Sequence, residues 1–210
     1  MRNCWQRKKF CNFVVSNDYS NERNEFFAAL NAHRPVDSGG GYMNNIGGPV
    51  TDKLAFQRGY KFSIAYENSR EPGYCTEKIV DAFAAATVPI YWGAPDVKQE
   101  FNPAAFLCAD DYPDTAALIA AIDEIDRDDE KFLAMCHAPI LAPDGSSRAA
   151  RYVTDEACAE FLTGIFEKGP HLRRNRSCWG SIYEGDWKYY RRLAEADRKP
   201  KGLLQRILGR

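Results

Sequence analysis

The chain has 210 residues, enough for one substantial α/β domain with a helical extension but too few for two full domains. Hydrophobic residues make up 45% and charged residues 27%, which excludes an intrinsically disordered chain and a membrane bundle. The net charge of −1 hides an asymmetry: residues 170–210 hold eleven lysines and arginines against four acidic residues, so the first 169 residues carry about −8. This predicts a globular domain over residues 1–169 and a basic, aromatic helical tail over residues 170–210.

The first third of the chain predicts a strand, a helix and two glycine loops. Aromatic and β-branched residues over 10–15 predict the strand, and the polar cluster after it predicts a loop. A helix is expected over about 22–31, because its apolar residues stand one helical turn apart. The glycines at 39–41 and 47–48 predict loops in which the backbone turns or makes a close approach.

A βαβ unit follows. Thr76 is placed to cap the N-terminus of its helix. We expect a right-handed crossover and parallel strands. The predicted elements are a short helix over 52–59, a buried strand over 61–66, a loop over 67–75, a helix over 76–86 and a strand over 88–92.

Beyond Pro95 the pattern is mostly helical. The fold class predicted is α/β: a doubly wound parallel sheet, Rossmann-like, with C-terminal helices. The further elements expected are a short strand over 106–108 and helices over 115–125, 129–136, 154–168 and 181–196.

The seven cysteines are odd in number and scattered, and none stands in C-x-x-C spacing. This argues against a disulfide framework and against a zinc site, and it predicts a reducing cytoplasm as the compartment. No run approaches the ~20 apolar residues that a membrane-spanning helix needs.

Two loops at the carboxyl ends of predicted strands, residues 16–23 and 67–78, are the candidate binding site. Arg23 and Lys78 stand at the starts of predicted helices, where a cation opposes the helix dipole by about 0.3–1 kcal/mol. Two such cations suggest one shared anion, such as a diphosphate. Arg23 could hold two phosphate oxygens and Lys78 could add a point charge, which together could stabilise a departing nucleoside diphosphate without a metal.

Three neighbours add neutral and acidic groups to this candidate site. Glu77 could accept hydrogen bonds from vicinal sugar hydroxyls, while Asn68 and Tyr74 offer neutral donors and a stacking face. A purely structural role stays open for each residue, since cations near helix starts are common and Glu77 is a favourable first-turn charge. From the residues alone, the sequence indicates an anion-binding α/β domain.

Three motifs carry a resemblance to a known family: residues 61–69 (KFSIAYENS), 73–79 (GYCTEKI) and 88–95 (VPIYWGAP). With supporting segments at 10–17, 23–24, 36–40 and 101–103, they resemble the donor-binding signature of the α-1,3/4-fucosyltransferases, glycosyltransferase family 10. The resemblance implies a GT-B architecture of two Rossmann-like domains, of which this chain matches the C-terminal, GDP-fucose-binding one. It implies an inverting enzyme that moves L-fucose from GDP-fucose to a hydroxyl of N-acetylglucosamine or glucose.

By this resemblance Arg23 and Lys78 contact the diphosphate as catalytic residues, and Asn68, Tyr74 and Glu77 contact the nucleotide and the fucose. No cofactor is required, and no acidic cluster indicates a divalent metal, whose involvement stays open. The expected acceptor is an oligosaccharide of lipopolysaccharide or N-acetyllactosamine type. The sequence lacks the family's N-terminal domain with its general base, so a factor of about 10²–10⁴ in rate should be missing and weak or no transfer is expected.

Alternatives also stay open. The fold could use another nucleotide sugar, or the chain could be a non-catalytic nucleotide-binding or membrane-associated module. Nucleic-acid binding is disfavoured, since the basic surplus avoids the main domain. The tail could lie on anionic lipid, which would place the protein on the inner face of the cytoplasmic membrane, or it could pack back on the domain.

Overall fold

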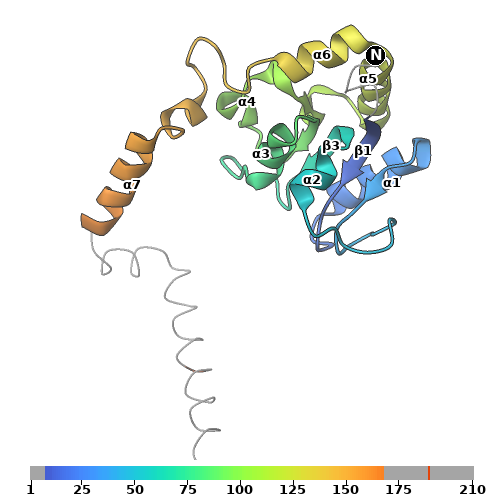
Figure 1. The fold of residues 1–210 in the computed structure, drawn as a ribbon, viewed down its shortest axis with the longest axis horizontal. Helices are drawn as coiled ribbons and strands as arrows, with labels where there is room; N and C mark the ends of the chain where they lie inside the picture. Colours follow the sequence, from blue (N-terminus) through green and yellow to red (C-terminus); the bar gives the residue numbers. More distant parts are fainter. Residues whose placement is uncertain (1–7, 168–188, 190–210) are drawn as a thin grey trace, which may run out of the picture. The chain divides into compact units, whose positions relative to one another are not determined.

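The computed structural model describes residues 8–167 and Tyr189 (Figure 1). One compact unit ends at Tyr152, and a second unit begins at Val153. The second unit includes α7 (Asp155–Glu167), close to the helix expected over 154–168. Apart from Tyr189, the predicted tail and the helix expected over 181–196 lie outside the described residues, and the domain boundary after residue 169 stays a prediction.

The first unit is built on a parallel sheet in the order β2-β1-β3-β4-β5. The register joins Phe62 to Val88 and Tyr66 to Trp92, so β3 and β4 end at the same edge. Every strand pair is parallel, which confirms the predicted doubly wound α/β class. The strands are β1 (Lys9–Phe13), β2 (Asp37–Ser38), β3 (Tyr60–Tyr66), β4 (Val88–Trp92) and β5 (Leu107–Cys108).

Short polar side chains start several helices of this unit. Ser20 accepts a hydrogen bond from the backbone N–H of Arg23, and Asp114 accepts one from Ala117, as N-cap residues do. The α-helices are α1 (Asn21–His33), α2 (Lys53–Gln57), α3 (Glu77–Ala84), α4 (Val97–Glu100), α5 (Thr115–Arg127) and α6 (Asp129–His137). The 3₁₀ turns among the described residues of this unit are η2 (Pro103–Ala105), η3 (Ala109–Asp111) and η4 (Arg148–Arg151).

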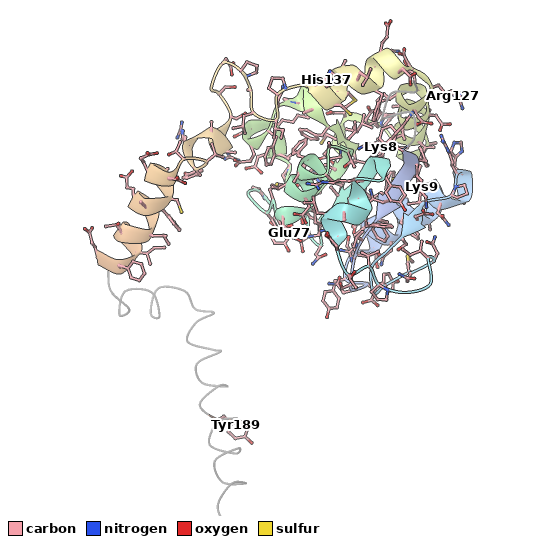
Figure 2. The ribbon with its side chains drawn as sticks, viewed as in Figure 1. Lys8, Lys9, Glu77, Arg127, His137 and Tyr189 are labelled. Carbon is pink, nitrogen blue, oxygen red and sulfur yellow. The ribbon has the colours of Figure 1, made fainter. Side chains whose placement is uncertain are left out.

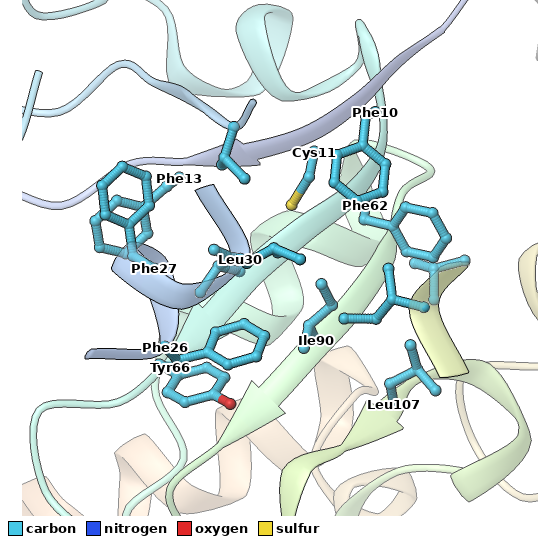
Figure 3. Close-up of a cluster of buried hydrophobic side chains, with 14 of the residues drawn as sticks. Phe10, Cys11, Phe13, Phe26, Phe27, Leu30, Phe62, Tyr66, Ile90 and Leu107 are labelled. Atoms are coloured by element: carbon cyan, nitrogen blue, oxygen red, sulfur yellow. The ribbon is translucent and has the colours of Figure 1, made fainter. Parts of the chain in front are cut away.

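Helices cover both faces of the sheet because side chains alternate along each strand. Phe62 and Tyr66 of β3 lie in the larger core, which includes residues of α1, α5 and α6 (Figure 3). Ala65 lies on the opposite face, in a smaller core with Ile79 of α3 and Val97 of α4. This double coverage explains why β3 reads in the sequence as a nearly continuous apolar run.

The glycine loop predicted at 39–41 is confirmed, but the sequence pattern does not predict the short strand before it. Residues 37–38 pair with β1 as β2 and are too few to show an alternating pattern. The strand expected over 10–15 ends at Phe13, and Gly40 packs against the segment after it. A Cβ on Gly40 would lie 1.9 Å from the carbonyl oxygen of Val15, so the close backbone approach requires glycine there.

Within residues 8–167, the helices are all too short or too polar to span a bilayer. The cysteines that the structure describes are free thiols at positions 11, 75, 108, 136 and 158.

Candidate functional site

The candidate site lies where the carboxyl ends of β1 and β3 meet. These strands are neighbours, but the chain leaves β1 toward β2 on one side while β3 leads to β4 on the other. Where the strand order reverses in this way, the connections diverge to opposite sides and open the crevice in which doubly wound folds bind ligands. The first turns of α1 and α3 meet this edge and carry Arg23 and Lys78.

Arg23 is a buried cation held by neutral groups. Its side chain belongs to a residue only 1% exposed. One guanidinium nitrogen, Nη1, donates to the side-chain oxygen of Asn68, and Nη2 donates to the backbone oxygen of Asn17 at 2.7 Å and to its side-chain oxygen at 3.0 Å. Burial lowers the pKa of Arg23, and the charge of Glu67 works in the opposite direction.

No carboxylate among the described residues forms an ion pair with Arg23, and its Nε atom is buried without a hydrogen-bond partner. A buried charge without a counter-charge is costly, so this position favours the arrival of an anion.

Glu67, directly after β3, is the organising carboxylate of the site. Its side chain is fully buried. One carboxylate oxygen accepts the backbone N–H of Thr76 at 2.7 Å, and the other accepts the Thr76 hydroxyl at 2.7 Å and the Lys78 ammonium at 2.8 Å. Glu67 therefore ties the first turn of α3 to the end of β3.

Thr76 occupies the N-cap position that the sequence predicts, but its side chain makes no capping hydrogen bond. Its hydroxyl donates to Glu67 instead, because that carboxylate is a stronger acceptor and lies within reach.

Gly93, directly after β4, covers Glu67. Its backbone has φ +154°, and a Cβ there would lie 2.5 Å from Cγ of Glu67 and 2.9 Å from the Tyr91 hydroxyl. Any larger residue would displace the buried carboxylate, so the site depends on a glycine at this position.

The structure gives Lys78 a partner that the sequence argument lacked. Its ammonium pairs with Glu67 at 2.8 Å, so its position against the helix dipole is compensated within the chain. Glu67, Thr76 and Asn17 were not among the predicted site residues. The available signal was an acidic residue directly after a buried strand, one position before Asn68.

The predicted site residues fall into two groups. Arg23 and Lys78 lie on either side of the adjacent residues Asn68 and Glu67, which they bind. Tyr74, 37% exposed, and Glu77 are at the surface of the same loop and helix; Glu77 is labelled in Figure 2.

Glu77 lies 3.7 Å from the Lys78 ammonium. Although partial burial works in the opposite direction, a hydrogen bond from its own backbone N–H and the charge of Lys78 lower the pKa of Glu77. Its carboxylate is therefore ionised at neutral pH and available as a hydrogen-bond acceptor.

The loop between β3 and α3 is anchored at its far side by Asp96. This carboxylate accepts the backbone N–H of Gly73 at 2.8 Å and the guanidinium of Arg148 at 2.6 Å. Both hydrogen bonds lower the pKa of Asp96, and the bond from Gly73 has the larger effect. The loop that carries Tyr74 is thus held in place before any ligand arrives.

The chemistry available is anion binding beside hydrogen-bonding groups suited to hydroxyls. Lys78 is paired with the fully buried Glu67 carboxylate, whereas Arg23 makes no ion pair with a described residue and is the cation left for an anion. Within the described part of the chain, no three His, Cys, Asp or Glu side chains are grouped so that they could hold a metal ion.

Comparison with known proteins agrees with this geometry. Residues 4–137 match the family model of the C-terminal part of glycosyltransferase family 10 (fucosyltransferase). The chain is 35% identical over 162 residues to the α-(1,3)-fucosyltransferase FucT of Helicobacter pylori, covering 77% of this chain and 34% of that protein. It is 36% identical over 119 residues to α-(1,3)-fucosyltransferase 4 of Mus musculus, covering 55% of this chain and 28% of that one.

Solved structures are similar as well. A crystal structure of α1,3-fucosyltransferase with GDP-fucose superposes with a TM-score of 0.69 at 34% identity, over 76% of this chain and 48% of that one. The structure with GDP gives a TM-score of 0.70 over 77% of this chain and 48% of that one. The chain therefore spans 28% to 48% of these relatives' length.

Proposed function

The chain belongs to glycosyltransferase family 10, the fucosyltransferases, and from this premise we propose that it is the donor-binding part of an inverting α-1,3-fucosyltransferase that uses GDP-fucose. The observation that carries the proposal is the buried Arg23 guanidinium, which has only neutral partners among the described residues. The diphosphate of GDP-fucose is an anion of matching charge, and similar structures bind GDP-fucose and GDP.

In the proposed reaction, an acceptor hydroxyl oxygen of N-acetylglucosamine or glucose attacks the anomeric carbon of fucose. The bond from that carbon to the β-phosphate oxygen breaks, and GDP leaves with the electron pair. Negative charge grows on the departing diphosphate, and Arg23 and Lys78 stabilise it as the catalytic residues. Lys78 is already oriented by Glu67 and Thr76. Arg23 reaches the phosphate by exchanging its bonds to Asn17 for phosphate oxygens.

We assign the remaining predicted site residues to the rest of the donor. Asn68, held by Arg23, and the exposed Tyr74 contact the nucleotide and the fucose, and the ionised Glu77 accepts hydrogen bonds from vicinal hydroxyls. The acceptor proton needs a base, which we place in a part of the enzyme outside this chain. Without it, transfer should be slower by about 10²–10⁴.

The proposed substrates are GDP-fucose and an acceptor of lipopolysaccharide or N-acetyllactosamine type, with no cofactor required. We place the protein in the cytoplasm, with the basic tail of residues 170–210 binding the inner, anionic face of the membrane. Sedimentation with anionic liposomes tests this role of the tail by comparing the whole chain with a chain that lacks residues 198–210. Equal liposome binding by the two proteins would rule out membrane binding through the tail.

Calorimetric titration of the whole chain with GDP and GDP-fucose tests the donor site, with UDP-glucose as the control nucleotide sugar. We expect GDP and GDP-fucose to bind and Arg23→Met to weaken GDP affinity by about 30- to 150-fold, since charged hydrogen bonds to phosphate are worth about 2–3 kcal/mol.

Arg34→Met, which removes a cation at the other end of α1, is the matched control and should leave GDP affinity unchanged. Equal GDP affinity in wild type and Arg23→Met would contradict the proposal. Robust fucose transfer to lactose by the isolated chain would contradict the placement of the base outside this chain.

A further inference from the structure

A second hollow opens on the α1 and α5 side of the same sheet edge, with a volume of about 380 Å³. It adjoins the anion site, because Tyr66 directly precedes Glu67, and the Glu67 backbone N–H donates to the Trp92 backbone oxygen at 2.8 Å. The residues around it are Glu22, Glu25, Phe26, Tyr66, Trp92, Ala109, Asp110, Tyr112, Asp114, Thr115 and Leu118.

Three stacked aromatic rings contribute to this hollow. Phe26 and Tyr66 stack with ring centroids 4.6 Å apart and an interplanar angle of 10° (Figure 3). Tyr66 and Trp92 continue the stack at 5.9 Å and 22°. Trp92 is half-buried, so part of its surface stays open. Apolar ring surface beside a few polar groups is typical of a small-molecule site.

The Tyr66 hydroxyl provides an independent sign of a ligand. The residue is only 4% exposed, yet its hydroxyl makes no hydrogen bond to any residue in the described part of the chain. Burial raises the pKa of Tyr66, and the nearby Cys108 and Asp110 act in the same direction, so the group stays a neutral O–H. The oxygen is not among the fully buried atoms without a partner, so it is open to the hollow that Tyr66 lines, where a ligand hydroxyl can reach it.

Carboxylates form the wall. Glu22 and Glu25 of α1 make no ion pair with any described residue. Asp110 pairs with Arg70 at 2.7 Å, and Asp114 accepts the Ala117 backbone N–H at 2.8 Å. No lysine or arginine lines the hollow, so it repels anions while it offers acceptors for hydroxyl groups.

We infer that this hollow binds a neutral pyranose ring of the acceptor glycan, stacked on Trp92 and hydrogen-bonded by Tyr66, Glu22 and Glu25. This inference rests on the proposed function and specifies its acceptor: uncharged sugars are admitted, and sugars that carry a carboxylate near the bound ring are rejected. The anion site and the sugar site then lie side by side with opposite charge, so each excludes the other's ligand.

Saturation-transfer NMR on the whole chain with saturating GDP tests the inference. The probes are lactose, 3′-sialyllactose, L-fucose and choline. We expect signals for lactose and none for sialyllactose. Tyr66→Phe keeps the ring stack but removes one hydroxyl, so lactose affinity should fall by about two- to tenfold. The pair Glu22→Gln and Glu25→Gln should admit sialyllactose.

Glu130→Gln, which changes an exposed acid on α6, is the matched control and should alter neither result. Lactose signals of equal strength in wild type and Tyr66→Phe would overturn the inference, as would binding of choline in place of lactose. Lactose bound more tightly than L-fucose supports an acceptor site, and the reverse order overturns that assignment. GDP titration of the same samples reports separately on the proposed function, because the hydroxyl that Tyr66→Phe removes lies outside the anion site.

Discussion

The two ends of the sheet differ in one buried charge. At the amino end, Lys9 pairs with Asp37 at 2.7 Å, and Asp126 binds both Arg34 and Lys61. At the carboxyl end Lys78 pairs with Glu67, but Arg23 is buried with hydrogen bonds to neutral groups only. Lys9 and Glu77, labelled in Figure 2, belong to these opposite ends.

This difference separates structural charge from functional charge. In an ion pair within the chain each charge already has its counter-charge, so the pair holds two elements together without a ligand. A buried cation that the chain leaves without a counter-charge weakens the free protein, and a bound anion recovers that loss as affinity. The carboxyl end is therefore where a ligand changes stability, and the variants below measure how far the contrast extends.

Lys78→Ala should give the largest effect, because it leaves the fully buried Glu67 carboxylate without its cation. The Thr76 hydrogen bonds remain, so we expect the free energy of unfolding to fall by about 2–4 kcal/mol. Urea unfolding measures it. The control is Lys53→Ala, which removes the partly exposed ion-pair partner of Asp81. Asp81 lies on α3, as Lys78 does, and this variant should lower the free energy of unfolding by less than about 1 kcal/mol.

Adding Glu67→Gln to Lys78→Ala should recover part of the lost stability, since the unpaired charge is then gone. A double variant no more stable than Lys78→Ala would show that the pair does not account for the effect.

Arg34→Met should lower the free energy of unfolding more than Arg23→Met does. Arg34 pairs with Asp126 and lies over the Phe10 ring, 3.9 Å from its centroid, so its loss should lower the free energy of unfolding by about 1 kcal/mol. Arg23→Met removes a buried charge without a counter-charge and should lower it less, or raise it. Thermal unfolding without nucleotide compares them, and a greater loss in Arg23→Met would break the contrast.

Asp126→Asn should lower the free energy of unfolding at neutral pH, and its difference from wild type should disappear in acid. Burial opposes ionisation of Asp126, but hydrogen bonds from Arg34 and Lys61 outweigh it and lower its pKa. Its stabilisation is present above the unfolded value of about 3.9 and is lost as the pH falls through the lower folded value. Stability measured from pH 6 to pH 2 should fall less steeply below about pH 4 in Asp126→Asn than in wild type. Parallel curves would show that Asp126 does not contribute.

The sequence predicts the central fold well, because β3, α3 and β4 are long and strongly patterned. It misses β2 and α4, whose two and four residues give no periodic signal. The meeting of Arg23 and Lys78 at one edge was predictable, since parallel strands place the helices that follow them at the same end.

The partners of these cations were not predictable from local pattern. That Lys78 binds Glu67 and Arg23 binds Asn17 depends on distances set by the folded loops rather than by spacing in the sequence. The aromatic stack shows the same limit: Phe26, Tyr66 and Trp92 come from three separate elements, and each alone reads as an ordinary core residue.

The missing side chain at Gly93 leaves room for two neighbouring side chains. A methyl group at position 93 would meet both the Glu67 side chain and the Tyr91 hydroxyl, and the backbone at φ +154° would strain any side chain there. Libraries at positions 93 and 67 should therefore return glycine at 93 even where residue 67 becomes smaller.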